Sequence, residues 1–138
     1  MGLNCEMTAP WRLPCLEAQL TRILQTRTKK TLPVNGLVVA AVLVPLFVKN
    51  GDPHVLLTKR SELVEHHRGE ISFPGGKMDP GDPDLLSCAL RETSEEVGIS
   101  PADVRIVGEL DDFYTVETHF IVAPFVGKIG RASCRERV

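Results

Sequence analysis

The sequence predicts an α/β sandwich, and three observations support that prediction. The chain has 138 residues, which suffice for one domain with a moderate core but not for two. The segment 37–48 is an apolar, largely β-branched run typical of a buried strand. The segment 82–97 has helical periodicity and lies between expected strands, so helices and strands alternate along the chain.

Composition and charge exclude several classes of protein. The net charge of −2 gives no general attraction to nucleic acid or to an anionic membrane, so neither is expected as a partner. The longest apolar run, 36–48, is too short to span a bilayer and contains a proline. The first 14 residues lack the features of a secretory signal, and the cysteines lack zinc-site spacing. We therefore expect a cytoplasmic protein, with a homodimer left open.

The N-terminal region, 1–30, is expected to be an arm that ends in a short helix. Residues 1–14 contain two prolines and show no periodicity. Leucine and isoleucine then recur at helical spacing and predict an amphipathic helix over 15–27. The main domain is expected to occupy residues 31–128.

The strands of that domain are expected between clear turn signals. Asn50-Gly51 predicts a tight reversal that joins two strands in a hairpin. The polar stretch 61–72 is expected to be a long functional loop, and Asp111-Asp112 a turn. The expected strands are, in order, 37–48, 54–60, 104–110 and 118–126.

The helix expected over 82–97 has good signals at both ends. Asp82 is a suitable N-cap because its carboxylate can accept hydrogen bonds from the first backbone N–H groups. Pro83 suits the first helical position, where an N–H has no partner in any case. Gly98 suits the left-handed conformation that ends many helices.

Three carboxylates of this helix share one face. Glu92, Glu95 and Glu96 are i, i+3 and i+4 neighbours and repel one another by roughly a few tenths of a kcal/mol per pair. A hard divalent cation such as Mg²⁺, which prefers carboxylate oxygens, would remove that repulsion. The alternative for such a cluster is a solvated acidic face.

The segment from Gly76 to Ile99 resembles the Nudix box, GX5EX7REUXEEXGU. Its core reads RETSEEVGI and matches every fixed position, with Thr93 where an aliphatic residue is usual. Asp82 stands at the first acidic position in place of glutamate, and eight residues instead of seven separate it from Arg91. The resemblance implies the Nudix fold, an α/β/α sandwich with a mixed sheet, and hydrolysis of a diphosphate linked to a nucleoside.

The segment before the box resembles a second signature, LLTXR(S/A)X3RX3GX3FPGG, found in Nudix hydrolases that act on coenzyme A. Residues 56–76 read LLTKRSELVEHHRGEISFPGG, and Glu65 stands where the signature has its second arginine. The residues expected from this resemblance to bind substrate are Arg60, Ser61, His67, Gly75 and Gly76.

Together the two resemblances imply a coenzyme A diphosphatase, or pyrophosphatase, that needs Mg²⁺ or Mn²⁺ and yields 4′-phosphopantetheine and adenosine 3′,5′-bisphosphate. The expected catalytic residues are Arg91, Glu92, Glu95 and Glu96, with the three glutamates as metal ligands and Arg91 paired with a carboxylate to orient them. Two alternatives stay open: a Nudix hydrolase of ADP-ribose, NADH or an oxidised dNTP, and a non-catalytic binding module. The general base is left unassigned among Glu109, Asp111, Asp112 and Glu117.

The last ten residues, 129–138, do not fit the pattern of the domain. They read IGRASCRERV and resemble the translation of a common sequencing adapter. We therefore expect a non-native tail on a Nudix domain that is incomplete at its C-terminus. A genuine polar tail is the alternative.

Overall fold

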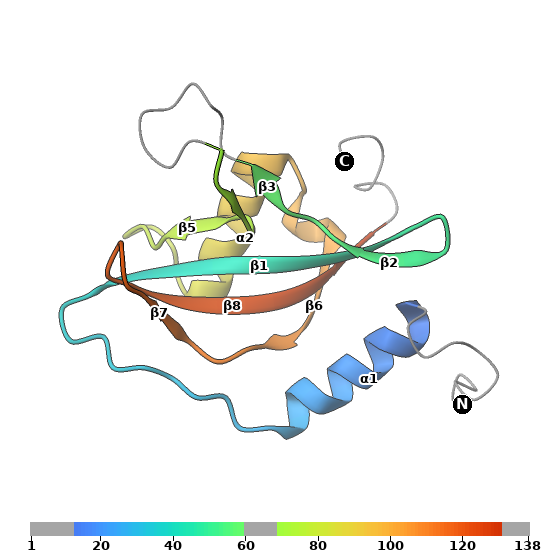
Figure 1. Ribbon diagram of the computed structural model, residues 1–138, viewed down its shortest axis with the longest axis horizontal. Coiled ribbons are helices and arrows are strands. Elements are labelled where there is room, and N and C mark those ends of the chain that lie inside the picture. Colours follow the sequence, from blue (N-terminus) through green and yellow to red (C-terminus); the bar gives the residue numbers. More distant parts are fainter. Residues whose placement is uncertain (1–12, 60–68, 131–138) are drawn as a thin grey trace.

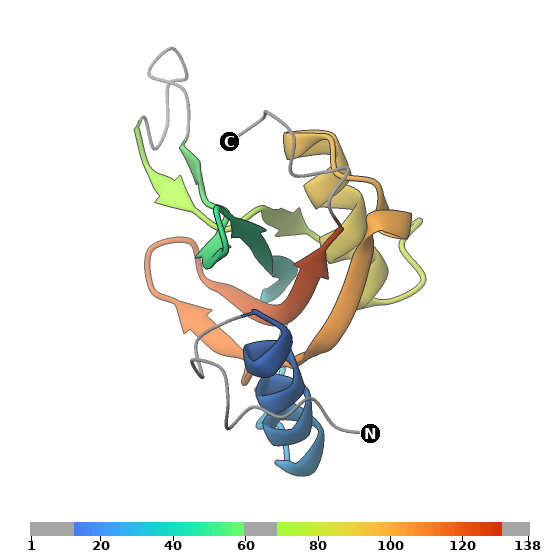
Figure 2. The same ribbon diagram turned by 90° about the vertical axis from the view of Figure 1, so that its right-hand side faces the viewer.

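A mixed β-sheet with one helix on each face forms the fold, as the computed structural model shows (Figure 1). The structure describes residues 13–59 and 69–130, with side chains from residue 16 onward. Helices α1 (Leu13–Thr26) and α2 (Leu85–Val97) lie on opposite sides of the sheet (Figure 2), and the short 3₁₀ helix η2 (Pro101–Asp103) follows α2. The expected α/β/α sandwich is confirmed. None of the helices in the described segments is long and apolar enough to cross a membrane.

Two long central strands organise the sheet. Strands β1 and β8 run parallel, from the pair Val38–Phe120 to the pair Leu46–Lys128, and every other pairing in the sheet is antiparallel. The order is β2-β1-β8-β6, with β5 also paired to β1 and β7 to β8, while β3 and β4 form a separate two-stranded sheet. The strands are β1 (Val38–Lys49), β2 (Asp52–Val55), β3 (Thr58–Lys59), β4 (Ile71–Ser72), β5 (Gly75–Lys77), β6 (Val104–Glu109), β7 (Phe113–Thr115) and β8 (Phe120–Ile129).

Each central strand contains a proline at the point where one outer strand gives way to another. On β1, the pairing with β5 ends at Val42 and that with β2 begins at Leu46, and Pro45 lies between them. On β8, Pro124 lies between the last residue paired with β7 and the first paired with β6. Proline has no N–H to donate to a ladder, so a gap between outer strands is where a central strand tolerates it.

The alternation of side chains along the central strands supplies both helix contacts. Odd-numbered residues such as Ala41, Leu43 and Phe125 pack against α2 around the buried Cys88 and Ala89. Even-numbered residues of the same strands, among them Leu46 and Val126, pack against Leu20 and Leu24 of α1. Strands buried on both faces have continuous apolar sequences, and 37–48 is such a sequence.

The expected strands are confirmed in outline and corrected in detail. The reversal at Asn50-Gly51 has positive φ at both residues, 53° and 81°, and pairs Lys49 with Asp52. The expected partner strand 54–60 divides, because β2 ends at Val55 and β3 joins a different sheet. Strands β4, β5 and β7 have only two or three residues and are too short to show periodicity in the sequence. Strand β8 runs through Ile129, and residues 131–138 lie outside the described part of the chain.

Asp111 and Asp112 bind the segment after α1 instead of forming the expected turn. The carboxylate of Asp111 pairs with Arg27, and Lys29 Nζ lies 3.0 Å from Asp112 Oδ1. Arg27 also donates to the backbone oxygen of Glu109 at 3.0 Å. The expectation of a turn was wrong because the partners of both acids come from about 80 residues away in the sequence.

Backbone groups complete this contact, which we call the N-terminal clasp and which comprises Arg27, Lys29, Lys30, Leu32, Glu109, Asp111 and Asp112. The backbone N–H of Lys30 donates to Asp111 Oδ1 at 2.9 Å, and that of Leu32 donates to Asp112 Oδ2 at 3.1 Å. These donors, Lys30 N–H first and Arg27 next, lower the pKa of Asp111. The clasp therefore ties residues 27–32 to the connection between β6 and β7.

Candidate active site

Helix α2 begins at Leu85, and its N-cap is Asp84. The Asp84 carboxylate accepts a hydrogen bond from the backbone N–H of Ser87 at 2.8 Å, which lowers the pKa of Asp84. The expectation that Asp82 caps the helix, with Pro83 in its first turn, was wrong. Both aspartates satisfy the local rule for an N-cap, and Asp82 has a partner elsewhere. Gly98 ends the helix at φ 73°, as expected.

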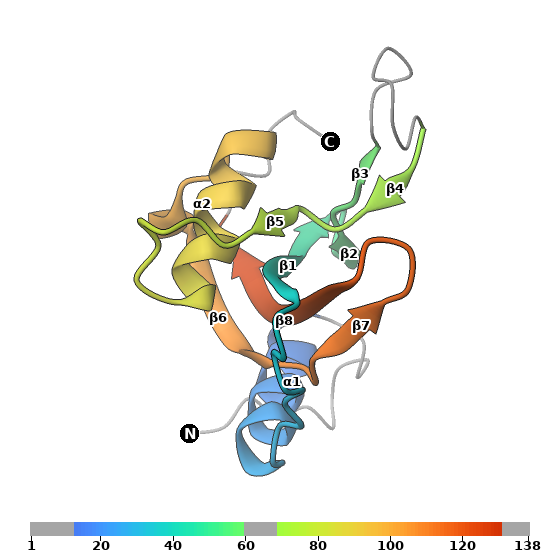
Figure 3. The same ribbon diagram turned by 90° about the vertical axis from the view of Figure 1, so that its left-hand side faces the viewer.

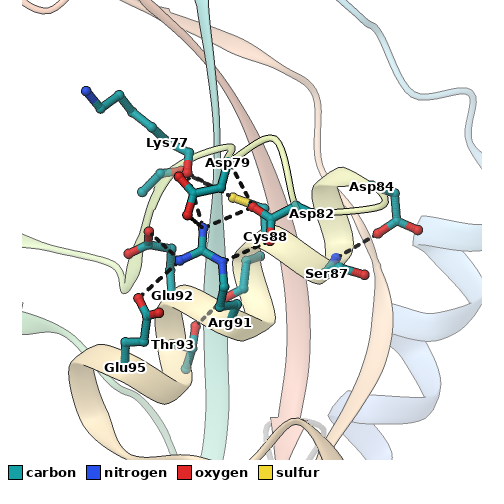
Figure 4. Close-up of polar contacts among 12 residues, drawn as sticks. Lys77, Asp79, Asp82, Asp84, Ser87, Cys88, Arg91, Glu92, Thr93 and Glu95 are labelled. Atoms are coloured by element: carbon teal, nitrogen blue, oxygen red, sulfur yellow. Dashed lines mark hydrogen bonds and ion pairs between the residues drawn. The ribbon is translucent and has the colours of Figure 1, made fainter.

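Asp82 forms a two-bond ion pair with Arg91. Arg91 Nε lies 2.9 Å from Asp82 Oδ1, and Arg91 Nη2 lies 3.0 Å from Asp82 Oδ2 (Figure 4). Asp82 also accepts from the backbone N–H of Asp79 at 2.8 Å, which closes the turn before the helix. The hydrogen bond from Arg91 is the main cause that lowers the pKa of Asp82 to about 2. Asp82 thus holds the turn and the guanidinium together.

Arg91 pairs with three further carboxylates besides Asp82. Its Nη1 donates to Glu92 Oε1 and to Glu95 Oε2, each at 3.1 Å, and its Nη2 lies 3.5 Å from Asp79 Oδ2. These contacts, that of Asp82 foremost, raise the pKa of Arg91, so the guanidinium stays charged. The expectation that Arg91 pairs with carboxylates beside the acidic face is met by this geometry. One cation serves four acids.

Strand β5 approaches α2 so closely that a side chain at position 76 would displace the Glu92 carboxylate. A Cβ added to Gly76 would lie 2.6 Å from Glu92 Cδ and within 2.8 Å of both carboxylate oxygens of Glu92. A Cβ on Gly75 would lie 2.3 Å from the backbone oxygen of Ala41 on β1. The missing side chains therefore let the strand pack directly against the Glu92 carboxylate and against β1.

Beneath this contact lies a buried thiol. Cys88 Sγ is 3.5 Å from the backbone oxygens of both Gly76 and Lys77, and burial raises the pKa of the thiol to about 11. The buried Thr93 donates to the backbone oxygen of Ala89 at 2.7 Å. Cys88 thus packs against β5 one turn before Glu92, on the side of α2 that carries the glutamates, and Thr93 is buried in the core.

The residues of this cluster suit a hard divalent cation by their chemistry. The donors are carboxylate oxygens, which Mg²⁺ and Mn²⁺ prefer, and Gly76 keeps the Glu92 carboxylate clear of a side chain. In the arrangement seen, Arg91 Nη1 holds both Glu92 and Glu95. Within residues 13–59 and 69–130, no three acidic, histidine or cysteine side chains converge closely enough to hold a metal ion. The role of Glu92, Glu95 and Glu96 as ligands stays a prediction.

The structure brings together some of the expected site residues and leaves others outside its described part. Arg91, Glu92 and Gly76 are in one cluster, with Gly75 next to it on β5. Glu95 and Glu96 are exposed on the same helix. Arg60, Ser61, His67 and Glu65 lie outside the described residues.

Two participants in the Arg91 cluster are not among the residues predicted from the sequence. Asp79 contributes a carboxylate to Arg91, and the backbone oxygen of Lys77 accepts from Arg91 Nη2 at 3.4 Å. The pattern Asp-Pro-Gly-Asp indicates a tight turn that brings the two aspartates together, and this could have suggested Asp79. Nothing in the sequence indicates a role for a backbone oxygen. Among the candidates for a general base, Asp111 and Asp112 are engaged in the N-terminal clasp.

Comparison with known proteins finds relatives among the Nudix hydrolases and a coenzyme A diphosphatase. NudL of Klebsiella aerogenes, an uncharacterized Nudix hydrolase, is 48% identical over 90 residues, which cover 65% of this chain and 73% of NudL. The mouse mitochondrial coenzyme A diphosphatase NUDT8 is 48% identical over 92 residues, which cover 66% of this chain. The match spans 43% of the mouse protein, so the chain corresponds to less than half of that relative.

Solved structures share the fold. A binary complex of an Ap4A hydrolase from Caenorhabditis elegans superimposes with a TM-score of 0.56 at 27% sequence identity, covering 69% of this chain and 68% of that one. The NUDIX domain family matches residues 37–130, which include β1, the Arg91 cluster and all of β8. The chain therefore belongs to the Nudix hydrolase family.

Proposed function

We propose that this chain hydrolyses the diphosphate bond of coenzyme A or of a coenzyme A derivative, giving 4′-phosphopantetheine and adenosine 3′,5′-bisphosphate. Nudix hydrolases act on nucleoside diphosphate derivatives, so the reaction class follows from the family. The choice of coenzyme A is supported by the sequence LLTKRS…FPGG before the box and by the name of the mouse relative.

The observation that carries the proposal is the surplus of carboxylates around Arg91. Asp79, Asp82, Glu92 and Glu95 all lie within 3.5 Å of one guanidinium. Such a surplus is costly unless a second cation shares it. A binding module with no need for metal would gain nothing from keeping all of these acids.

Glu92, Glu95 and Glu96 are the residues that would hold Mg²⁺ or Mn²⁺. A divalent ion bound there would neutralise the charge of a diphosphate while water attacks phosphorus. Arg91 orients Glu92 and Glu95 through Nη1, and Asp82 fixes Arg91 in turn. Gly76 lets the backbone of β5 lie directly against the Glu92 carboxylate. Cytoplasmic location and a homodimer stay predictions, and the mouse relative is named as mitochondrial.

Turnover of a set of diphosphates tests the proposal. The full chain, with Mg²⁺ and then Mn²⁺, is given equal concentrations of coenzyme A, ADP-ribose, NADH and Ap4A, and the products are separated by chromatography. We expect coenzyme A to have the highest kcat/KM and to yield the two products named above. A higher kcat/KM for one of the other compounds would identify that compound as the preferred substrate and would leave the proposed reaction class unchanged.

A second substrate has specific support. Glu65 stands where the coenzyme A signature has an arginine, and a carboxylate there disfavours a phosphate contact. Hydrolysis of another nucleoside diphosphate derivative is therefore the alternative for the same site. Absence of turnover for every compound, with Mg²⁺ binding also absent in calorimetry, would favour a non-catalytic module.

A further inference from the structure

A row of mostly apolar residues crosses the sheet on the face that carries α2. Tyr114 of β7 pairs with Ile121 of β8, and Ile121 pairs with Val39 of β1. The backbone N–H of Met78 donates to the backbone oxygen of Val39 at 3.0 Å and extends the row past β5. Directly paired residues share a face, and Val39 is two residues from Ala41, which packs beneath α2.

This row lies beside the Arg91 cluster and is open at both ends. Tyr114 is 42% exposed and Met78 36% exposed, while Ile121 between them is buried. Met78 follows Gly76 by two residues, so the row lies about 7 Å along the strand from the glycine that contacts Glu92. A diphosphate at the carboxylates would place the group attached to it within reach of the row.

The hairpin that carries Tyr114 is well ordered by its own hydrogen bonds. Tyr114 Oη lies 2.5 Å from His119 Nδ1, and the backbone N–H of His119 donates to the backbone oxygen of Thr115 at 2.8 Å. The side-chain oxygens of Thr115 and Thr118 lie 2.5 Å apart. Asp112, which immediately precedes β7, is fixed by the N-terminal clasp. An aromatic ring that is exposed yet fixed in place is organised for binding before a ligand arrives.

We propose that Tyr114 stacks on the nucleobase of the substrate and that the row from Tyr114 to Met78 is the specificity surface for that base. The inference rests on the proposed function for its choice of a nucleoside diphosphate. Figure 3 shows β7 and its turn projecting from the sheet. A planar heterocycle matches a fixed aromatic ring and an apolar floor. A flexible aliphatic chain has no flat face to stack on the ring.

The chain offers a matched control next to Tyr114. Phe113 is also aromatic and 46% exposed, but it pairs with Val122 and therefore lies on the opposite face of the sheet. Calorimetry with Mg²⁺ present measures the dissociation constants of ADP, which has a base, and of inorganic diphosphate, which has none. The proteins compared are the full chain, Tyr114→Ala, Tyr114→Phe, Tyr114→Leu and Phe113→Ala.

We expect Tyr114→Ala to weaken ADP binding about tenfold, as the loss of one base–aromatic stack does, and to leave the dissociation constant of diphosphate unchanged. Tyr114→Phe should keep the ring and most of the ADP affinity. Tyr114→Leu should lose ADP affinity although its apolar volume is similar. Phe113→Ala should change the dissociation constant of neither ADP nor diphosphate. Equal losses for ADP and diphosphate, or a loss for Phe113→Ala as large as for Tyr114→Ala, would overturn the inference. So would unchanged ADP binding in a folded Tyr114→Leu protein. If the chain hydrolyses none of the diphosphates but Tyr114→Ala still weakens ADP alone, the proposed function fails and the base site stands.

Discussion

The Arg91 cluster and the N-terminal clasp are built from the same residue types in different proportions. In the Arg91 cluster, four carboxylates lie around one guanidinium, and Glu95 remains 59% exposed. In the clasp, Arg27 and Lys29 face Glu109, Asp111 and Asp112, and backbone N–H groups satisfy further oxygens. The clasp is nearly balanced in charge and joins two segments. The Arg91 cluster has an excess of negative charge, which suits a site that binds a cation.

The comparison predicts opposite outcomes for removing one acid from each cluster, and this is the largest effect we expect. Glu92→Gln should lower metal-dependent turnover by at least about 100-fold, because it removes a carboxylate from the proposed ligand set. Asp112→Ala should leave turnover per folded molecule unchanged but lower the free energy of unfolding by about 0.5–1.5 kcal/mol, because the Leu32 N–H loses its acceptor and Lys29 loses an ion pair. Turnover assays and urea unfolding of both variants check the two expectations. Full activity in Glu92→Gln would show that Glu92 is not one of the metal ligands.

Alanine substitutions at two glycines test the same difference between a metal site and a structural contact. An alanine at Gly76 would meet the Glu92 carboxylate, which is the flexible end of a side chain and can rotate away. Gly76→Ala should therefore weaken Mn²⁺ binding in calorimetry with little change in stability.

An alanine at Gly108 would instead meet Leu24 Cβ of α1 at 2.5 Å, so the helix must shift. Gly108→Ala should cost about 1–3 kcal/mol in unfolding free energy and leave Mn²⁺ affinity intact. If the two variants had the same effect on metal affinity, the division between a site and a structural contact would be refuted.

The smallest predicted effect concerns acid, where the two clusters should behave alike. The pKa of Asp82 falls from its ordinary 3.8 to about 2 in the folded protein, mainly through Arg91. A carboxyl group with a lowered folded pKa stabilises the fold above its unfolded pKa, so this contribution is complete above about pH 4 and is lost as the pH falls towards 2. The pKa of Asp111 is also lowered, by the Lys30 N–H and Arg27, so its contribution is lost in acid in the same direction.

Unfolding free energies measured between pH 2 and pH 6 for the parent chain, Asp82→Asn and Asp111→Asn check this. Each variant should lose part of the decline in stability that the parent shows between pH 4 and pH 2. A variant curve parallel to that of the parent would show that the substituted acid titrates normally in the folded chain.

Local sequence rules predicted the helix and the central strands. Features that depend on contacts with distant residues, such as the choice of N-cap, could not be predicted from them. The periodicity of RETSEEVGI placed the glutamates on one face of α2 because spacing within a helix is a local property. The same rules could not choose between Asp82 and Asp84 as the cap, since both precede the helix and both are aspartates. The choice depends on Arg91, which lies nearly two turns into the helix and holds Asp82.

The N-terminal clasp could not be predicted from the sequence for a related reason. Asp111-Asp112 has the composition of a turn, and Arg27 to Lys30 has that of a solvated helix end. Only the packing of Leu20 and Leu24 against Val107 and Val126 brings these two charged segments together. Their opposite charges were visible in the sequence, but the distance of about 80 residues between them concealed the contact.

The two prolines of the central strands divide the sheet into separately paired halves. Before Pro45 and Pro124, β1 and β8 pair with β5 and β7, which carry Gly76 and Tyr114. After them, the same strands pair with β2 and β6, next to the contacts of α1. The outer strands that border the acidic cluster can therefore detach without breaking a hydrogen bond of the other half. Amide exchange should accordingly resolve two cooperative units along one continuous pair of strands.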